Sequence, residues 1–256
     1  MGADLPVLEV DLGTGVRAAF TTRVGGVSIG GYAQLNLGLE VGDDPRRVRA
    51  NRDAVARWLG APVAFAHQVH GAGVRIVSRL PAAPQVVVGE GDALVTRSTR
   101  LGVGVLVADC VPVLLADAAS GVVAAVHVGR RGLVAGVVLR AVDEMVAEGA
   151  HLPEIAAVVG PAICGACYEV PAAMQAEVGS VVRGTTSVTS WGTPALDLAA
   201  GAAAQLRDRG VRHVSRVNVC TREDDRLYSH RRAGTTHGAT GRFAGVIRLL
   251  EPPTTA

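Results

Sequence analysis

The middle of the chain constrains the fold most strongly, because three short apolar runs follow one another there. They cover residues 101–108, 111–116 and 122–128, are rich in valine, and are separated by Asp, Pro, Ser or Gly residues. Continuous apolar runs of this length are typical of strands that are buried on both faces. Such strands need a covering layer on each side, so this region predicts the interior of a layered domain.

Helices and further strands are predicted on both sides of this region. Asp44 and Pro45 are typical of a helix start, and that helix is expected to end at Gly60. A pair of hydrogen-bonded strands is predicted at 62–69 and 73–77, around a turn that contains glycine. Additional strands are expected at 16–22, 155–159, 214–219 and 243–250, and additional helices at 132–149, 172–178 and 194–209. This mixture predicts an α/β layered fold, although it does not give the strand order.

The composition fits one globular domain over residues 1–256, because neither a low-complexity linker nor an internal repeat divides the chain. Hydrophobic residues make up 49% of the sequence and charged residues 19%, which excludes a disordered chain. Aromatic residues make up only 3%, so aliphatic side chains must form most of the core.

The charged residues exclude several classes of function. The formal net charge of +2 gives no general attraction to nucleic acid or to a membrane surface. All 25 basic residues are arginine, which excludes Schiff-base chemistry and the lysine of a Walker motif. The N-terminus lacks the pattern of a signal peptide, and no apolar stretch approaches the roughly 20 residues that span a bilayer. We therefore expect a soluble cytoplasmic protein that holds anions on arginine, on backbone N–H groups or on a metal.

Three residues at the ends of apolar segments are candidate metal ligands: His70, Cys110 and His127. Strand ends combine a rigid scaffold with access to solvent. Two imidazoles and one thiolate leave a fourth coordination position open, which is the pattern of catalytic rather than structural zinc. The spacing alone leaves another interpretation open, because a cysteine in an apolar run is commonly a small core residue.

Motifs along nearly the whole chain resemble one known family. They are TTRVGGVS at 21–28, NLGL at 36–39, GDDP at 42–45, NR at 51–52, QVHG at 68–71, DALVT at 92–96, ADCVP at 108–112, GPAI at 160–163, CYEV at 167–170 and YSHRR at 228–232. This ordered set is similar to the YfiH/YlmD family of laccase-domain proteins, once called multicopper polyphenol oxidases and related to human FAMIN.

The resemblance implies a layered α/β sandwich with mixed β-sheets flanked by helices. It also implies one Zn²⁺ ion on His70, Cys110 and His127, with copper as an alternative at the same ligands. The implied activities are phosphorolysis of inosine, adenosine, guanosine and methylthioadenosine, together with deamination of adenosine. The expected partners are therefore purine nucleosides and phosphate, without nucleic acid or membrane, and the expected state is a monomer or weak homodimer.

The matched motifs also imply roles for single residues. Catalysis is expected from Cys110, His127 and Asp109, and substrate binding from Arg23, Asn36, Gln68 and Arg131. Arg23 stands beside a Gly-Gly pair and Arg131 at an expected helix start, and arginine binds phosphate through paired hydrogen bonds. The alternative for both arginines is a solvated surface charge.

Two segments depart from the family pattern. The family usually has His-Ala-Gly-Trp-Arg-Gly where this chain has His-Val-Gly-Arg-Arg-Gly at 127–132, so Arg130 replaces an aromatic ring. We expect this exchange to alter the substrate pocket. The stretch 233–242 is also longer than usual.

The same residues allow other functions. A copper oxidase fits poorly, because the seven histidines include no His-x-His pair and no methionine is nearby as an axial ligand. A cysteine hydrolase or amidase acting on peptidoglycan precursors would use Cys110 as a nucleophile activated by His127. A third alternative is a non-catalytic protein in which zinc only ties strands together.

Two further features are interpreted as structural. Cys164 and Cys167 form a C-x-x-C motif, but no second C-x-x-C follows that would complete a metal site. His67 lies three residues before His70 and is expected to support the site rather than to bind the ion.

Overall fold

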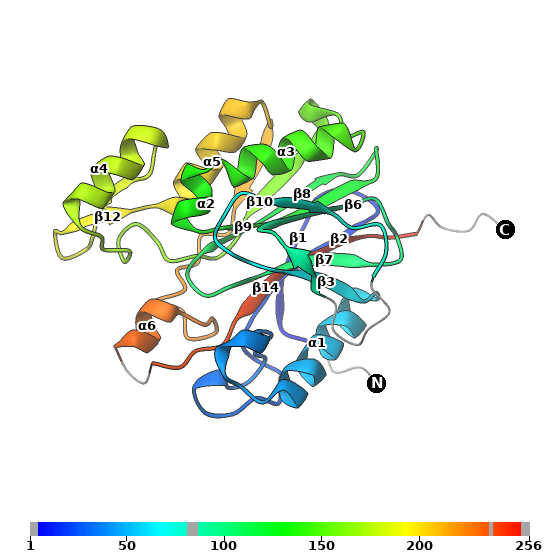
Figure 1. Ribbon diagram of the computed structural model, residues 1–256, viewed down its shortest axis with the longest axis horizontal. Coiled ribbons are helices and arrows are strands. Elements are labelled where there is room, and N and C mark those ends of the chain that lie inside the picture. The colour runs from blue at the N-terminus through cyan, green and yellow to red at the C-terminus, as the bar shows by residue number, and fades with distance from the viewer. Residues whose placement is uncertain (1–4, 81–86, 236–237, 252–256) are drawn as a thin grey trace.

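Two six-stranded sheets lie face to face at the centre of the molecule, and helices cover the outer face of each (Figure 1). The structure, a computed structural model, describes residues 5–80, 87–235 and 238–251. Residues 236 and 237, within the 233–242 stretch that the sequence marks as long, lie outside this description. Among the described residues, no helix combines the length and the apolar character needed to cross a bilayer.

Both sheets mix parallel and antiparallel pairs. The first sheet has the order β1 (Val7–Val10), β2 (Val16–Thr21), β14 (Phe243–Leu249), β7 (Gly102–Val107), β3 (Val63–His67) and β5 (Val87–Glu90). The second has the order β13 (His213–Arg216), β10 (Ala156–Val159), β8 (Val111–Asp117), β9 (Val122–Val128), β6 (Ala93–Thr96) and β4 (Val74–Ile76). A separate pair joins β11 (Thr186–Val188) and β12 (Pro194–Leu196). The expected α/β sandwich with mixed sheets is confirmed.

The helices form the two outer layers. On the first sheet lies α1 (Pro45–Leu59), and on the second lie α2 (Arg130–Val134), α3 (Val137–Ala147) and α5 (Leu198–Arg209) (Figure 1). The pair β11–β12 packs against α4 (Ala172–Val181), and α6 (His230–Gly234) lies apart from these layers. Three short 3₁₀ turns complete the described elements: η1 (Gly30–Tyr32), η2 (Leu39–Val41) and η3 (Leu152–Glu154).

Three apolar interfaces hold the layers together. Phe20, Leu114 and Ile247 belong to the core between the two sheets. Val55 of α1 packs with β3 and β14 in a second core, and Leu206 of α5 packs with α3 and the second sheet in a third. Aliphatic side chains dominate all three, as the low aromatic content predicts. Their burial, at about 25 cal/mol per Å² of apolar surface, is the main force that holds the sheets in register.

Local signals predicted several elements well. The helix at 45–59 begins where the Asp44 carboxylate accepts a hydrogen bond from the Arg46 N–H at 2.8 Å, and it ends at Gly60, whose φ is 79°. The three central apolar runs form β7, β8 and β9, as predicted. The predicted helix 132–149 is instead two helices, because Gly136 adopts a left-handed conformation with φ 78° between them. The predicted helix 194–209 begins only after Asp197, which caps α5.

The predicted pairing of strands 62–69 and 73–77 is wrong. These segments form β3 and β4, which belong to different sheets. The glycine-containing segment between them does not close a hairpin, because it carries the chain from the first sheet to the second.

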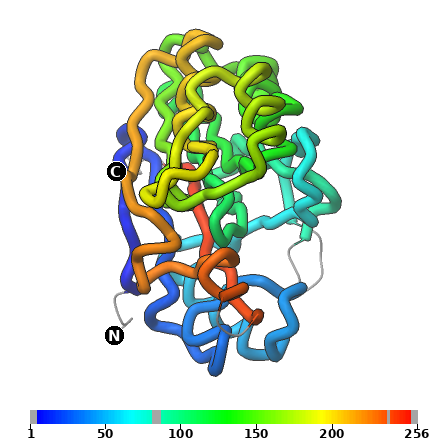
Figure 2. Tube along the Cα trace, turned by 90° about the vertical axis from the view of Figure 1, so that its left-hand side faces the viewer, coloured from blue at the N-terminus to red at the C-terminus, as the bar shows by residue number. Residues whose placement is uncertain are grey.

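The chain makes this passage from the first sheet to the second three times in succession. The connections are residues 68–73 between β3 and β4, 91–92 between β5 and β6, and 108–110 between β7 and β8. A separate, long segment from β13 to α6 runs down one side of the molecule away from the α3–α5 layer (Figure 2). The candidate site lies where the three short connections meet.

Candidate metal centre and active site

The three predicted metal ligands converge at these connections. His70 lies on the first connection, Cys110 on the third, and His127 near the end of the neighbouring strand β9. The Cys110 Sγ and His70 Nε2 atoms are 3.7 Å apart. The imidazole rings of His70 and His127 are 4.7 Å apart between centroids and nearly perpendicular, at 84°. One ligand atom from each of the three residues lies within 4.8 Å of the other two.

Asp92, on the second connection, holds two of these ligands in place. Its Oδ1 atom accepts hydrogen bonds from the His127 Nδ1 at 2.7 Å and from the His70 backbone N–H at 2.9 Å. Its Oδ2 atom accepts a third from the Gly71 N–H at 2.7 Å. Because Nδ1 of His127 is occupied by the carboxylate, Nε2 is the nitrogen left for an ion. Asp92 is the first residue of the DALVT motif, which by itself predicts no role for it.

The backbone is strained at this centre. His70 and Asp109 have φ values of 58° and 85°, and they are the only described non-glycine residues in the left-handed region. Strained conformations of this kind cluster at functional sites because the surrounding structure maintains them. Gly129 permits the close packing, since a Cβ atom there would come within 2.7 Å of the His70 ring. The chain thus maintains unfavourable geometry to bring these ligands together.

The electrostatics favour an ionised cysteine. Burial by itself raises the pKa of the Cys110 thiol, but the charge of His127 and hydrogen bonds from both histidines lower the pKa to about 6. Burial lowers the pKa of His127, but the Cys110 thiolate and the hydrogen bond to Asp92 raise it to about 9. Without an ion, these opposite shifts favour a thiolate on Cys110 and an imidazolium on His127 at neutral pH.

The donor set fits a metal ion of the zinc type. Zinc bonds sulfur at about 2.3 Å and nitrogen at about 2.0–2.1 Å, so a tetrahedral site has an S···N edge of about 3.6 Å. The separation of 3.7 Å between Cys110 Sγ and His70 Nε2 matches that edge. Three protein ligands leave one position for water or substrate.

A cavity of about 730 Å³ opens over the three ligands. This volume is typical of small-molecule sites, which hold about 300–1,000 Å³. Five arginines line it, against the two carboxylates of Glu40 and Asp109. The arginines are Arg52, Arg130, Arg131, Arg231 and Arg242. Their excess of positive charge indicates an anionic ligand.

These arginines differ in how firmly they are held. The side chains of Arg52, Arg231 and Arg242 each donate to a backbone carbonyl, on Leu37, Glu169 and Gly241 respectively. Within the described part of the chain, the guanidinium groups of Arg130 and Arg131 make no hydrogen bond or ion pair. Arg130 and Arg131 are therefore the cations most available to an incoming anion.

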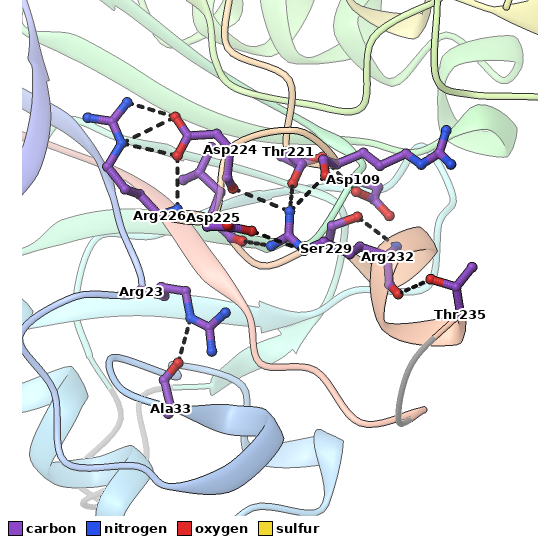
Figure 3. A network of polar contacts seen from close by, with 12 residues as sticks. Arg23, Ala33, Asp109, Thr221, Asp224, Asp225, Arg226, Ser229, Arg232 and Thr235 are labelled. Atoms are coloured by element: carbon purple, nitrogen blue, oxygen red, sulfur yellow. Dashed lines mark hydrogen bonds and ion pairs between the residues drawn. The ribbon is translucent and has the colours of Figure 1, made fainter. Parts of the chain in front are cut away.

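The residues predicted to bind substrate divide into two groups. Arg131 and Gln68 line the cavity, although the Gln68 amide exchanges two hydrogen bonds with the backbone of Leu106. Arg23 and Asn36 are not among the described residues that line it. Arg23 donates to the Ala33 carbonyl at 2.6 Å (Figure 3). Asn36 is fully buried and bonds Gly38, Asp43 and the Arg242 N–H. This geometry favours structural roles for Arg23 and Asn36.

Asp109 lines the cavity next to Cys110, but its carboxylate is already bonded on both oxygens. Oδ1 accepts from the Thr221 hydroxyl and Oδ2 from the Arg231 N–H, each at 2.6 Å. Thr221 lies on the loop before α6 and Arg231 lies in α6. The Arg232 guanidinium of α6 connects the two by donating to the carbonyl of Thr221 (Figure 3) and to that of Leu227. Asp109 thus ties the metal centre to the loop before α6.

Two other residues complete the surroundings. Tyr168 lines the cavity, and the Arg231 guanidinium lies over its ring, with Cζ 5.2 Å from the ring centroid. Burial, with the charge of Cys110, raises the pKa of the Tyr168 phenol, so it stays protonated at neutral pH. His67 also lines the cavity, where it bonds Glu40 at 3.0 Å, and it lies outside the group of three ligands. Tyr168 was quoted in a motif, but the sequence did not show that it faces the cavity.

The fold and this centre together define a class: an α/β sandwich with a His₂Cys cluster at the connections between its sheets. Residues 17–250 match the family model described as multi-copper polyphenol oxidoreductase laccase. The chain belongs to this family.

This chain is similar in sequence to proteins named purine nucleoside phosphorylase. It is 52% identical over 236 residues to a protein of Streptomyces griseus named purine nucleoside phosphorylase ORF3, covering 90% of this chain and 93% of the relative. It is 41% identical to a purine nucleoside phosphorylase of Deinococcus radiodurans, covering 96% of this chain and 93% of the relative. These identities support an enzyme.

Solved structures confirm the fold. A Neisseria meningitidis protein superposes with a TM-score of 0.84 at 35% identity, covering 96% of this chain and 99% of that chain. YlmD from Geobacillus stearothermophilus superposes with a TM-score of 0.84 at 33% identity, covering 93% of each chain. The resemblance to the YfiH/YlmD family is therefore confirmed.

Proposed function

We propose that this protein is a zinc-dependent purine nucleoside phosphorylase that also deaminates adenosine. The observation that carries the proposal is the His₂Cys cluster at the floor of an arginine-lined cavity. The names of the relatives support the same activity. The proposed substrates are inosine, adenosine, guanosine and methylthioadenosine with phosphate. The proposed state is one domain acting as a cytoplasmic monomer or weak homodimer.

Phosphorolysis transfers the ribosyl group from the purine to phosphate. A phosphate oxygen forms a bond to C1′ while the bond from C1′ to the purine nitrogen breaks. The purine leaves with the electron pair and takes up a proton, so the products are the free base and ribose 1-phosphate. When bound, zinc would supply Lewis-acid activation at the centre of this cavity.

The chain's own residues would hold both substrates. Arg130 and Arg131 would bind phosphate, because guanidinium groups pair with phosphate oxygens through parallel hydrogen bonds. Tyr168 offers a ring on which a purine base can stack. Asp109, held by Thr221 and Arg231, would act at the reacting atoms beside Cys110. Asp92 would keep His127 oriented through the reaction.

Deamination of adenosine would use the same centre. Water adds at C6 of the base, a proton passes to the amino group, and ammonia leaves to give inosine. Both reactions place a purine nucleoside in one cavity, but phosphate attacks C1′ and displaces the base, whereas water attacks C6 and displaces ammonia.

Product analysis with and without phosphate tests the proposal. We expect base release from inosine to require phosphate and to yield one ribose 1-phosphate per base. Adenosine should also yield inosine and ammonia without phosphate. Base release from inosine at the same rate in the absence of phosphate would exclude a phosphorylase.

One observation favours a second candidate, a cysteine hydrolase or amidase. Without a metal, Cys110, His127 and Asp92 form a nucleophile, a base and an orienting carboxylate, which is the arrangement of a catalytic triad. The lowered pKa of Cys110 suits such a nucleophile. A covalent acyl-cysteine trapped by mass spectrometry in the metal-loaded protein would favour this candidate over the phosphorylase.

A further inference from the structure

A second group of metal-ligand side chains lies outside the cavity. It consists of Cys164, Cys167, Cys220 and Glu223, and one ligand atom from each lies within 4.8 Å of all the others. The sequence alone gave Cys164 and Cys167 a structural role, because no second C-x-x-C follows. In the folded chain the second half is supplied by Cys220 and Glu223, which have the same spacing of two intervening residues. We refer to these four residues as the thiol cluster.

The backbone presents the two halves in the same way. The Cys167 and Tyr168 N–H groups both donate to the Cys164 carbonyl, each at 2.9 Å. The Glu223 and Asp224 N–H groups likewise both donate to the Cys220 carbonyl, at 3.2 and 2.9 Å. Each half is thus a tight turn that directs two side chains to one side, as in the paired C-x-x-C turns of structural zinc sites.

The two turns are also joined to each other. Ala162 forms a parallel β-bridge with Cys220, with hydrogen bonds from Ala162 N to Val219 O at 3.3 Å and from Thr221 N to Ala162 O at 3.0 Å. The Cys164 N–H donates to the Cys220 Sγ at 3.4 Å. This backbone donor to sulfur favours the thiolate form that a metal requires. The backbone therefore fixes the cluster before any ion binds.

The distances match a tetrahedral ion. Zinc–sulfur bonds of about 2.3 Å and zinc–oxygen bonds of about 2.0–2.2 Å give an S···O edge of about 3.6 Å. The Cys167 Sγ and the Glu223 Oε1 are 3.5 Å apart. Glu223 is exposed, yet its carboxylate turns toward a sulfur that is almost fully buried. All four cysteines of the chain are free thiols, so no disulfide competes for these atoms.

We propose that Cys164, Cys167, Cys220 and Glu223 bind a second zinc ion in a closed structural site. Four protein ligands leave no position for water or substrate, which distinguishes this site from the open His₂Cys centre. Binding displaces the thiol protons to solvent, while the carboxylate is already ionised. A disulfide fits less well, since it would leave one of the three sulfurs unpaired and Glu223 without a role.

The second ion would hold in place two loops next to the cavity. Tyr168, which lines the cavity, follows Cys167 directly, and Thr221, which bonds Asp109, follows Cys220 directly. The Ile163 N–H, just before Cys164, donates to the Asp109 carbonyl at 3.1 Å. The thiol cluster thus fastens two loops that are far apart in sequence and that both contact the residue beside Cys110.

Zinc content of the full-length protein tests this inference, which does not depend on the proposed function. After purification with Zn²⁺ and removal of loosely bound ion, we expect two zinc ions per chain. Cys110→Ala should retain one, and the double variant Cys167→Ala with Cys220→Ala should also retain one. Glu223→Ala should weaken retention of the second ion against a chelator at least tenfold, whereas the neighbouring carboxylate variant Asp225→Ala should not.

A second measurement needs no change in the thiol cluster and keeps the inference testable if the double variant does not fold. Cobalt substituted into Cys110→Ala protein should show intense sulfur-to-metal charge-transfer absorption, because three thiolates remain at the thiol cluster. One zinc ion per wild-type chain, no such absorption, or a disulfide among Cys164, Cys167 and Cys220 by mass spectrometry would overturn the second site. Failure of phosphorolysis with two zinc ions bound would reject the proposed function alone.

Discussion

The two ligand clusters of this chain contain similar atoms but stand in different surroundings. The His₂Cys centre lies at the floor of a cavity, and Asp92 orients two of its ligands. The thiol cluster does not line this cavity and is held by paired turns of backbone. The thiols differ accordingly, since His127 and His70 lower the pKa of Cys110 to about 6, whereas burial and the neighbouring thiols raise the pKa of Cys167 to about 12. The two clusters therefore differ in solvent access, in local charge and in how their ligands are oriented, although both contain cysteine sulfur.

Loss of the ion from the cavity should have the largest effect on activity. We expect Cys110→Ala to reduce kcat/KM for inosine phosphorolysis by about a thousandfold, because Lewis-acid activation contributes several kcal/mol and each 1.36 kcal/mol is a factor of ten. Steady-state kinetics with phosphate measures this loss. Activity within threefold of wild type would remove the metal centre from the mechanism.

Alkylation of the metal-free protein should separate the two clusters by at least about a hundredfold at pH 7.5. Thiolate is the reactive form, and at this pH it predominates for a group with a pKa of about 6 and is rare for one with a pKa of about 12. The rate at Cys110 should fall as the pH drops through about 6, since protonation then removes the thiolate. Peptide mapping after iodoacetamide treatment gives both rates.

Two controls sharpen the alkylation experiment. His127→Ala removes the charge that lowers the pKa, so the midpoint at Cys110 should rise toward 9. Zinc should protect Cys110 in the wild-type protein. Equal rates at Cys110 and Cys167 in the metal-free state would contradict the electrostatic difference between the clusters.

The orienting carboxylate should matter next. We expect Asp92→Asn to weaken zinc binding at the His₂Cys centre by about 10–100-fold, the usual effect of removing a group that orients a ligand. Asp117→Asn is a matched control, because Asp117 is equally buried and accepts backbone hydrogen bonds from Ser120 and His151. Competition with a chromogenic chelator measures the affinity. Equal losses in both variants would show that Asp92 acts through general stability alone.

The smallest expected effect concerns phosphate. Arg131→Ala should raise the phosphate KM about tenfold, because a charge-assisted hydrogen bond contributes about 1.5–3 kcal/mol. Arg23→Ala tests the role predicted from sequence, and its bond to the Ala33 carbonyl leads us to expect a smaller change in phosphate KM. A larger effect at Arg23 than at Arg131 would move the phosphate site away from the cavity.

Signals that act over a few residues predicted the fold best. Asp44 and Gly60 marked the ends of α1 because a cap depends only on adjacent backbone. The same local logic failed between β3 and β4, where a glycine-containing segment resembles a hairpin turn. Asp92 holds that segment through the N–H groups of His70 and Gly71, and this long-range contact has no sequence pattern.

The candidate site was predictable in part. His70, Cys110 and His127 were candidate ligands because they stand at the ends of apolar segments, but only the family resemblance favoured a metal site, since ligands 40 and 17 positions apart follow no spacing rule. Asp92 could not be assigned, because its role depends on donors that meet only in the folded chain. Glu223 was missed for a similar reason, since an exposed glutamate in a loop looks like ordinary surface until Cys167 lies beside it.

The three successive passages between the sheets have a consequence for the order of folding. They carry His70, Asp92 and Cys110, so all three residues meet only when strands of both sheets are in place. Contacts between such distant segments are among the last and slowest to close. An ion that binds only the docked arrangement then stabilises the final state and not its precursors. Metal capture at the cavity would therefore act as a signature of completed assembly, appearing late in refolding and after the first helical structure.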